Sequence, residues 1–150
     1  MGVIGNKNQN ILQALSLDGR ISNTELAAKV GLSPSACLRR TQELERSGVI
    51  SHYRAVLNPI AMDIGFTAYL AVGLSDHTKA SQEAFEAAIT RSPEVREYHN
   101  VTGSFEYMLR VETKDLLSYK VFHTDVLGVL PQVRSITTFV VMGSPKDDRA

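Results

Sequence analysis

Apolar positions recur at helical spacing through the first third of the chain. The spacing predicts a first helix over 6–18, with an apolar face made of Ile11, Leu12 and Leu15. A second helix is predicted after Ser22, because a capping hydroxyl there is followed three residues later by Glu25. Gly31 then stands where a left-handed residue would end that helix and let the chain turn sharply.

A third helix is predicted from Ser33-Pro34, which supply a capping hydroxyl and a proline at the first helical position. Together the helices predict a helix-turn-helix bundle, whose last helix is the one that enters a DNA major groove. One side of this helix is a stripe small enough for close packing, made of Cys37, Thr41, Leu44 and Gly48. The far side carries Ser35, Arg39, Gln42 and Arg46, with Ala36 and Glu43 at its edge and Arg40 on a flank.

The residue types on this far side suit base recognition. Short residues near the helix start let its N-terminus approach base edges, and Arg39 and Gln42 can make paired hydrogen bonds to guanine or adenine. A solvated face of a core helix is the alternative, and the turn and the caps favour the groove-reading interpretation. The predicted DNA-binding residues are Ser33, Ser35, Ala36, Arg39, Arg40, Gln42 and Arg54.

Residues 49–59 alternate apolar and polar side chains and predict a strand, which Asn58-Pro59 ends. On this strand, His52 and Arg54 could reach the DNA backbone as a wing does, or they could lie on a solvated face. The pattern divides the chain into four parts: a DNA-binding domain over 1–58, a linker over 59–65, a second domain over 66–142 and a polar tail over 143–150.

From Phe66 the pattern predicts a second kind of domain. Strands are predicted over 66–74, 94–102, 105–113 and 132–142, with helices over 81–91 and 116–127 and a turn at Gly103-Ser104. The order β-α-β-β-α-β is the ferredoxin-like arrangement, so the whole chain is assigned to the α+β class. Helices then cover only one face of the sheet. The other face would expose Tyr69, Ala71, Tyr98 and Val101 or their neighbours, and such an apolar face predicts a homodimer.

The charge of the chain is divided unevenly. The net charge is zero, yet residues 1–58 hold seven Lys and Arg against four Asp and Glu, which leaves residues 59–150 with an acidic excess. This asymmetry indicates a basic module that faces phosphates, joined to an acidic one that avoids them. The excess is small, so useful affinity for double-stranded DNA requires two or more copies acting together.

Composition excludes several function classes. No run of eighteen apolar residues exists to span a membrane, and the N-terminus lacks the pattern of a secretion signal. The single cysteine, Cys37, fits a reducing compartment, and we expect a cytoplasmic, nucleoid-associated protein. The four histidines show no metal-ligand pairing and no catalytic motif is present, so neither an enzyme nor a cofactor is expected. Cys37 is interpreted as a small core residue rather than a nucleophile.

Residues 18–59 closely resemble the Lrp/AsnC family of leucine-responsive and asparagine-responsive, or feast/famine, transcription regulators. The segment VGLSP carries the resemblance with a following cysteine, Arg40, Leu44-Glu45 and Gly48 at their spacings. It extends to VTGSFEYMLRV over 101–111 and to TTFVVM over 137–142. The family implies a winged or plain helix-turn-helix and a ferredoxin-like module that dimerises and then assembles, commonly to octamers. It also implies that amino acids bind between dimers and alter assembly or DNA binding.

The resemblance also assigns roles to residues. Ser35, Ala36, Arg39, Arg40 and Gln42 match the recognition-helix positions, and residues 101–107 match the effector loop. A glycine turn lets backbone amides approach a carboxylate, and Glu106 could serve the ammonium, although the family usually has Asp there. A hairpin turn for Gly103 and a solvated strand residue for Glu106 are the plain alternatives. The predicted effector-binding residues are Tyr98, Thr102, Gly103, Ser104, Glu106 and Thr138.

Two functions remain open on the sequence alone. One is a regulator gated by a small effector, and the other is a ligand-independent architectural protein that bends or wraps DNA by oligomerising.

Overall fold

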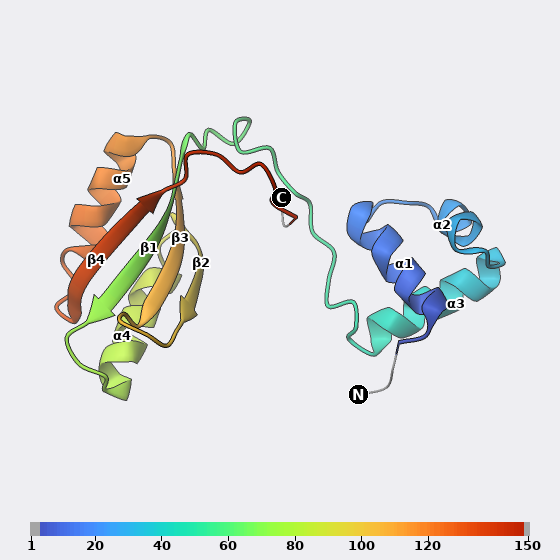
Figure 1. Cartoon of the computed structure of the whole chain (residues 1–150), viewed down its shortest axis with the longest axis horizontal. Coiled ribbons are helices and arrows are strands. Elements are labelled where there is room, and N and C mark those ends of the chain that lie inside the picture. Colours follow the sequence, from blue (N-terminus) through green and yellow to red (C-terminus); the bar gives the residue numbers. More distant parts are fainter. Residues whose placement is uncertain (1–3, 149–150) are drawn as a thin grey trace. The chain divides into compact units, whose positions relative to one another are not determined.

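The computed structural model describes residues 4–148, so the last two residues of the predicted tail and the first three of the predicted DNA-binding domain lie outside them. The chain divides between Ala55 and Val56 into two compact units (Figure 1). The predicted linker over 59–65 belongs to the second unit, where turns hold it: Ile64 N donates to Pro59 O at 2.9 Å.

The first unit is a bundle of α1 (Asn6–Leu17), α2 (Asn23–Val30) and α3 (Pro34–Arg46). The predicted caps are present. Ser22 Oγ accepts a hydrogen bond from Glu25 N at 3.2 Å, and Ser33 Oγ accepts one from Ala36 N at 3.3 Å. Between the two helices Gly31 has a φ of 65°, a left-handed conformation that glycine adopts without strain.

The core of the first unit is small and is made of side chains from all three helices. Its buried side chains are Ile11, Leu26, Ala27, Val30, Cys37 and Leu44. Lys7 adds a polar tie from α1, because its Nζ donates to Val30 O at 2.7 Å at the C-terminal end of α2. Cys37 is completely buried, which agrees with its interpretation as a core residue.

The predicted strand over 49–59 is wrong. Residues 51–58 run without secondary structure and every residue from 51 to 63 is exposed. An alternating sequence becomes a strand only when a neighbouring strand satisfies its backbone N–H and C=O groups. No described segment of this chain pairs with it.

The second unit has the predicted ferredoxin-like order. Its elements are β1 (Phe66–Leu74), α4 (Lys79–Thr90), β2 (Val95–Asn100), β3 (Tyr107–Thr113), α5 (Leu116–Phe122), the π-helix η1 (His123–Leu127) and β4 (Val133–Val140). The four strands form one antiparallel sheet in the order β2-β3-β1-β4.

The helix predicted over 116–127 changes its winding halfway. After α5 it continues as η1, and Gly128 N closes this wider turn on His123 O at 2.8 Å. A Cβ at Gly128 would lie 2.8 Å from Thr124 O, so only glycine allows the chain to approach so closely.

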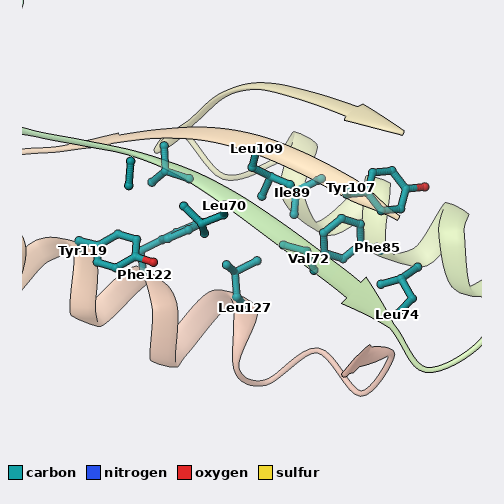
Figure 2. Close-up of a cluster of buried hydrophobic side chains, with 12 residues drawn as sticks. Leu70, Val72, Leu74, Phe85, Ile89, Tyr107, Leu109, Tyr119, Phe122 and Leu127 are labelled. Carbon is teal, nitrogen blue, oxygen red and sulfur yellow. The ribbon is translucent and has the colours of Figure 1, made fainter. Parts of the chain in front are cut away.

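Both helices of the second unit pack on the same sheet face. Figure 2 shows Phe85 and Ile89 of α4 and Tyr119 and Phe122 of α5 meeting side chains of the central strands. Along β1 these are Leu70, Val72 and Leu74, and along β3 they are Tyr107 and Leu109. The opposite face carries no helix among the described residues, as the sequence predicted.

The composition of that bare face differs from the prediction at two residues. Tyr98 pairs with Leu109 in the ladder and packs against the core, so it lies on the helix-covered face. Ala71 lies on the bare face beside Tyr69 but is only 4% exposed. Phe139, paired with Tyr69, supplies the exposed aromatic surface instead.

Candidate functional site

The outward face of α3 is polar and open. Ser35, Arg39 and Gln42 are exposed there, whereas Cys37 and Leu44 on the inward face are buried. The predicted division of the helix into two faces is therefore confirmed for these residues. Gly48 of the predicted packing stripe is the exception, because it lies beyond the end of α3 and is exposed. Arg39 and Gln42 are the sixth and ninth of the thirteen residues of the helix.

The start of α3 is held by its cap. Ser33 is exposed, and its Oγ lies 3.4 Å from Ser35 Oγ, so the two hydroxyls form one small polar group. Ala36 is half-buried behind them. Pro34 at the first helical position has no N–H, which leaves fewer unbonded donors at this end.

Arg40 differs from the other residues predicted to bind DNA. It is half-buried, and its Nη1 donates to Asn8 Oδ1 of α1 at 3.1 Å. Its Nε is buried without a hydrogen-bond partner in the part of the chain that the structure describes. Arg40 therefore joins α3 to α1. The helical spacing placed Arg40 on a flank of α3 but did not predict this contact.

The C-terminal end of α3 is electrically compensated. Arg46 forms an ion pair with Glu43, and Tyr53 donates from its hydroxyl to Glu45 Oε1 at 2.8 Å. Burial and this bond to a carboxylate raise the pKa of Tyr53 to about 12. Arg54 follows in the exposed segment after the helix.

The loop between β2 and β3 is longer than the predicted two-residue turn. It spans residues 101–106, and Val101 N donates to Glu106 O at 2.8 Å across its base. Gly103 has a φ of 133°, a value that residues with a side chain rarely adopt. A Cβ at this position would have no heavy atom within 4 Å. Thr102, Gly103 and Ser104 are all exposed, so the loop presents backbone groups to its surroundings.

Glu106 is neither a solvated strand residue nor a free carboxylate. Its Oε2 accepts a hydrogen bond from Leu74 N at 2.6 Å, and its Oε1 lies 3.3 Å from His77 Nδ1. The side chain is only 12% exposed. Glu106 thus ties the loop to the end of β1, a contact between residues far apart in the sequence.

Two predicted effector residues do not face this loop. Tyr98 shares a hydrogen bond of 2.9 Å between its hydroxyl and Thr90 Oγ1 on α4. Thr138 is bonded to the hydroxyl of Tyr119 on α5, and burial raises the pKa of that phenol. Both side chains are directed to the helix-covered face of the sheet.

The structure brings other residues to Glu106 instead. A Cβ at Gly73 would lie 3.7 Å from Glu106 Oε2 and 3.3 Å from Arg134 Nη2. Of these neighbours only Gly73 has a signal in the sequence, because a glycine inside an apolar strand indicates a close approach. Nothing local marks His77, which lies in the loop after β1, or Arg134, whose position on β4 follows from strand pairing.

A hollow of about 360 Å³ lies beside this region, lined by Ser75, Asp76, Ala80, Ser81, Ala84, Pro131 and Gln132. Asp76 accepts hydrogen bonds from Thr78 Oγ1 at 2.6 Å and from Ser81 Oγ at 3.0 Å. The bonds from Thr78 chiefly lower the pKa of this carboxyl. The carboxylate of the hollow is therefore engaged with the start of α4.

Among residues 4–148, no cluster of His, Cys, Asp and Glu has the arrangement of a metal site. In the same residues, no helix combines the length and the apolar character that crossing a membrane requires.

Known proteins match both units. The family model of the Lrp/AsnC ligand binding domain matches residues 67–150, and a model of winged helix-turn-helix DNA-binding matches residues 6–51. The leucine-responsive regulatory protein of Salmonella typhimurium is 40% identical over 138 residues, which are 92% of this chain and 84% of that protein. The protein of the same name from Escherichia coli is 39% identical over the same coverage.

Solved structures agree with these matches. A transcriptional regulator from Neisseria meningitidis, in complex with L-Met, superposes with a TM-score of 0.92 at 32% identity over 97% of this chain and 94% of its own. An AsnC family regulator from Agrobacterium tumefaciens gives 0.89 at 28% identity over 96% and 94%. The chain therefore belongs to the Lrp/AsnC family of transcriptional regulators, with a helix-turn-helix DNA-binding domain followed by a ligand-binding domain.

Proposed function

We propose that this chain binds operator DNA through the N-terminal half of α3, and that a free amino acid at the 101–106 loop changes its assembly or its DNA binding. The observation that carries the first part is the exposed set Ser35, Arg39 and Gln42 on one helix face. Arginine and glutamine there can each make two hydrogen bonds to one base edge.

The distribution of charge decides which half of α3 enters the groove. Residues 34–42 contain Arg39 and Arg40 and no acid, whereas Glu43 and Glu45 follow directly after them. Arg46 forms an exposed ion pair with Glu43, so the charges of these two residues offset each other. Because DNA phosphates repel carboxylates, the second half of the helix lies away from the backbone and the first half approaches the bases.

The remaining predicted DNA contacts go to the backbone. Ser33 accepts from Ala36 N, so its own hydroxyl hydrogen can be donated to a phosphate at the helix N-terminus. Arg54 lies in the exposed segment and supplies a positive charge without base specificity. We assign Arg40 mainly to positioning, because its guanidinium is held by Asn8 and half-buried.

DNA recognition is tested with the full chain. Operators are selected from random DNA, and affinity for the selected and for random duplexes is measured over a range of salt. Specific binding exceeds non-specific binding by about a thousandfold or more in proteins of this kind. Equal affinity for both duplexes at every salt concentration would contradict the proposal.

The bare sheet face is proposed to join two copies. Phe139 is 55% exposed on it and lies beside Tyr69, next to the charged pair of Arg110 Nη2 and Glu112 Oε1 at 3.0 Å. A dimer would hide the aromatic surface and would provide two recognition helices to one operator. Further assembly, with an octamer as the expected form, follows from the family alone.

Assembly is tested by the mass of the particle in solution. Phe139→Glu should lower the mass, because a carboxylate would be buried between sheets. Leu17→Glu, at an 83% exposed residue of α1, is the control and should leave the mass unchanged. If both variants keep the wild-type mass, the sheet face is not the contact.

The effector proposal rests on the loop that surrounds Gly103. Its open backbone amides can hold the carboxylate of an amino acid. The ammonium would displace His77 from Glu106 Oε1, while Leu74 N keeps its bond to Oε2. The relative from Neisseria meningitidis, which is in complex with L-Met, supports an amino acid as the ligand class.

The effector is tested by titrating the chain with the twenty amino acids while melting temperature and particle mass are followed. Gly103→Glu should remove the response, since it adds a side chain at a φ of 133° in the loop. Gly143→Glu is the matched control, because a Cβ there also meets nothing within 4 Å and φ is not in the left-handed region. No shift with any amino acid in the wild type would contradict the effector role.

A ligand-independent architectural protein is the second candidate, favoured by the need for several copies on DNA. Footprints on arrays of half-sites, with and without amino acid, separate the two functions. A regulator changes its footprint or its mass, and an architectural protein changes neither. In either case we place the protein in the cytoplasm with the nucleoid, because DNA is its partner and its one cysteine is a reduced core residue.

A further inference from the structure

One large apolar side chain interrupts the polar outward surface of α3. Leu38 is 47% exposed and takes no part in the core of the first unit. It stands three residues after Ser35 and four before Gln42, spacings that place the three on one side of the helix. An apolar side chain therefore lies among the residues proposed to read bases.

The neighbours of Leu38 suit a groove rather than a protein core. Ser35 and Gln42 are exposed beside it, and neither could be buried in an apolar contact without losing hydrogen bonds to water. In a major groove, the same mixture is favourable. The floor of the groove offers donors and acceptors for polar side chains, together with the 5-methyl group of thymine.

The position along the helix is also suitable. Leu38 belongs to the half of α3 that carries no acid, one turn after the N-terminus. A helix rises about 1.5 Å per residue and DNA about 3.4 Å per base pair, so Leu38 and Gln42 are roughly two base pairs apart.

We infer that Leu38 recognises a thymine in each operator half-site by packing against its 5-methyl group, about two base pairs from the base that Gln42 contacts. This inference rests on the proposed entry of α3 into the major groove. It assigns to this chain a base preference that the arginine and the glutamine alone would not give.

The test removes the methyl group without changing any hydrogen bond. Each thymidine of the selected operator is replaced in turn by deoxyuridine, and binding is measured for the wild type, Leu38→Ala and Leu17→Ala. Deoxyuridine at one position of each half-site should lower the affinity of the wild type about fourfold, which is the value expected for the loss of one buried methyl group. Leu38→Ala should bind both duplexes equally. Leu17→Ala, which changes an 83% exposed leucine of α1, should keep the wild-type sensitivity.

Three results would overturn the inference. They are a wild type that tolerates deoxyuridine everywhere, a Leu38→Ala variant that keeps the fourfold sensitivity, and a Leu38→Ala variant that changes particle mass instead of base preference. The wild-type series decides even if Leu38→Ala folds poorly, and Leu38→Gln provides a second helix-compatible variant. Failure of the wild type to select any sequence would instead reject DNA reading itself.

Discussion

The outward face of α3 and the loop over 101–106 differ in how many separate parts of the chain build them. All the residues of α3 that are proposed to read bases lie within nine consecutive positions, and the cap that starts the helix directly precedes them. The loop instead depends on β1 through the bond from Leu74 N to Glu106, and its conformation depends on the pairing of β2 with β3. A site on one helix forms when that helix forms, whereas a site at the end of a sheet forms only when the strands pair in the correct register.

The two regions also differ in how strongly substitutions in them should affect folding. The face of α3 can vary at its exposed residues without loss of folding, because the packing is provided by the opposite side. The loop has no such separation, since Glu106 both accepts the bond from Leu74 N that holds the loop to β1 and is the proposed partner of the ammonium. Changes in ligand preference would therefore alter stability more readily than changes in DNA preference.

The largest expected effect tests whether the two regions are independent. Leu70 is completely buried in β1, so Leu70→Ala should lower the free energy of unfolding of the second unit by about 2–5 kcal/mol. Residue-resolved hydrogen exchange should show faster exchange of β1 and β3 and unchanged exchange of α2 and α3. An equal loss of protection in both units would show that they fold as one.

Arg39→Ala comes next and addresses the face of α3. Loss of a paired base contact should cost about 1–3 kcal/mol per half-site on the selected operator, without a change in melting temperature. Arg54→Ala is the comparison, because a phosphate contact should weaken all sequences alike and reduce the salt dependence. If Arg39→Ala loses as much affinity for random DNA as for the operator, Arg39 does not read a base.

Glu106→Ala addresses the loop. It leaves Leu74 N without its acceptor, so the second unit should lose about 1–3 kcal/mol in free energy of unfolding. Glu106→Gln keeps an acceptor oxygen and should recover part of this loss. Glu83→Ala, at an exposed carboxylate paired with Lys79, should change stability little. The measurement is chemical denaturation, and equal midpoints for all three variants would remove Glu106 from the structural role.

The smallest expected effect is the loss of stability of the second unit at low pH. Neutral serines cap α2 and α3, whereas Asp115 caps α5, and hydrogen bonds from Ser118 N and Oγ hold the pKa of Asp115 below its ordinary 3.8. A lowered folded-state pKa stabilises the fold above the unfolded-state value and loses this contribution as pH falls through the folded-state value.

The second unit should therefore be weakened slightly more than the first as pH falls below about 4. Asp115→Asn should reduce this difference, because asparagine caps a helix without titrating. Amide signals of the two units followed by NMR between pH 5 and 2 would measure the order of loss. Earlier loss of α2 and α3 would contradict the comparison.

Prediction from the sequence succeeded where the signals were local. The boundaries of α2 and α3 follow from Ser22, Gly31 and Ser33, each of which acts on backbone groups within about four residues. The strand over 49–59 failed for the opposite reason. Its alternation was real, but no described segment pairs with it.

The sheet shows the same limit at a single residue. The ladder between β2 and β3 shifts register between Val95 and Glu97. One extra residue in a strand moves every later side chain to the other face, so Tyr98 lies with Leu109 on the helix-covered side. The alternating pattern alone could not reveal that shift.

The sequence by itself determined the family, the two domain types, and the inward and outward sides of α3, because periodicity and caps act over one or two helical turns. Only the tertiary structure decided that Arg40 bonds to Asn8 and that Glu106 contacts Leu74 and His77. The same holds for the hydrogen bond between Thr138 and the hydroxyl of Tyr119. All these contacts join residues that are 19 to 32 positions apart in the sequence. Their geometry is set by helix packing and strand register, which no short stretch of sequence contains.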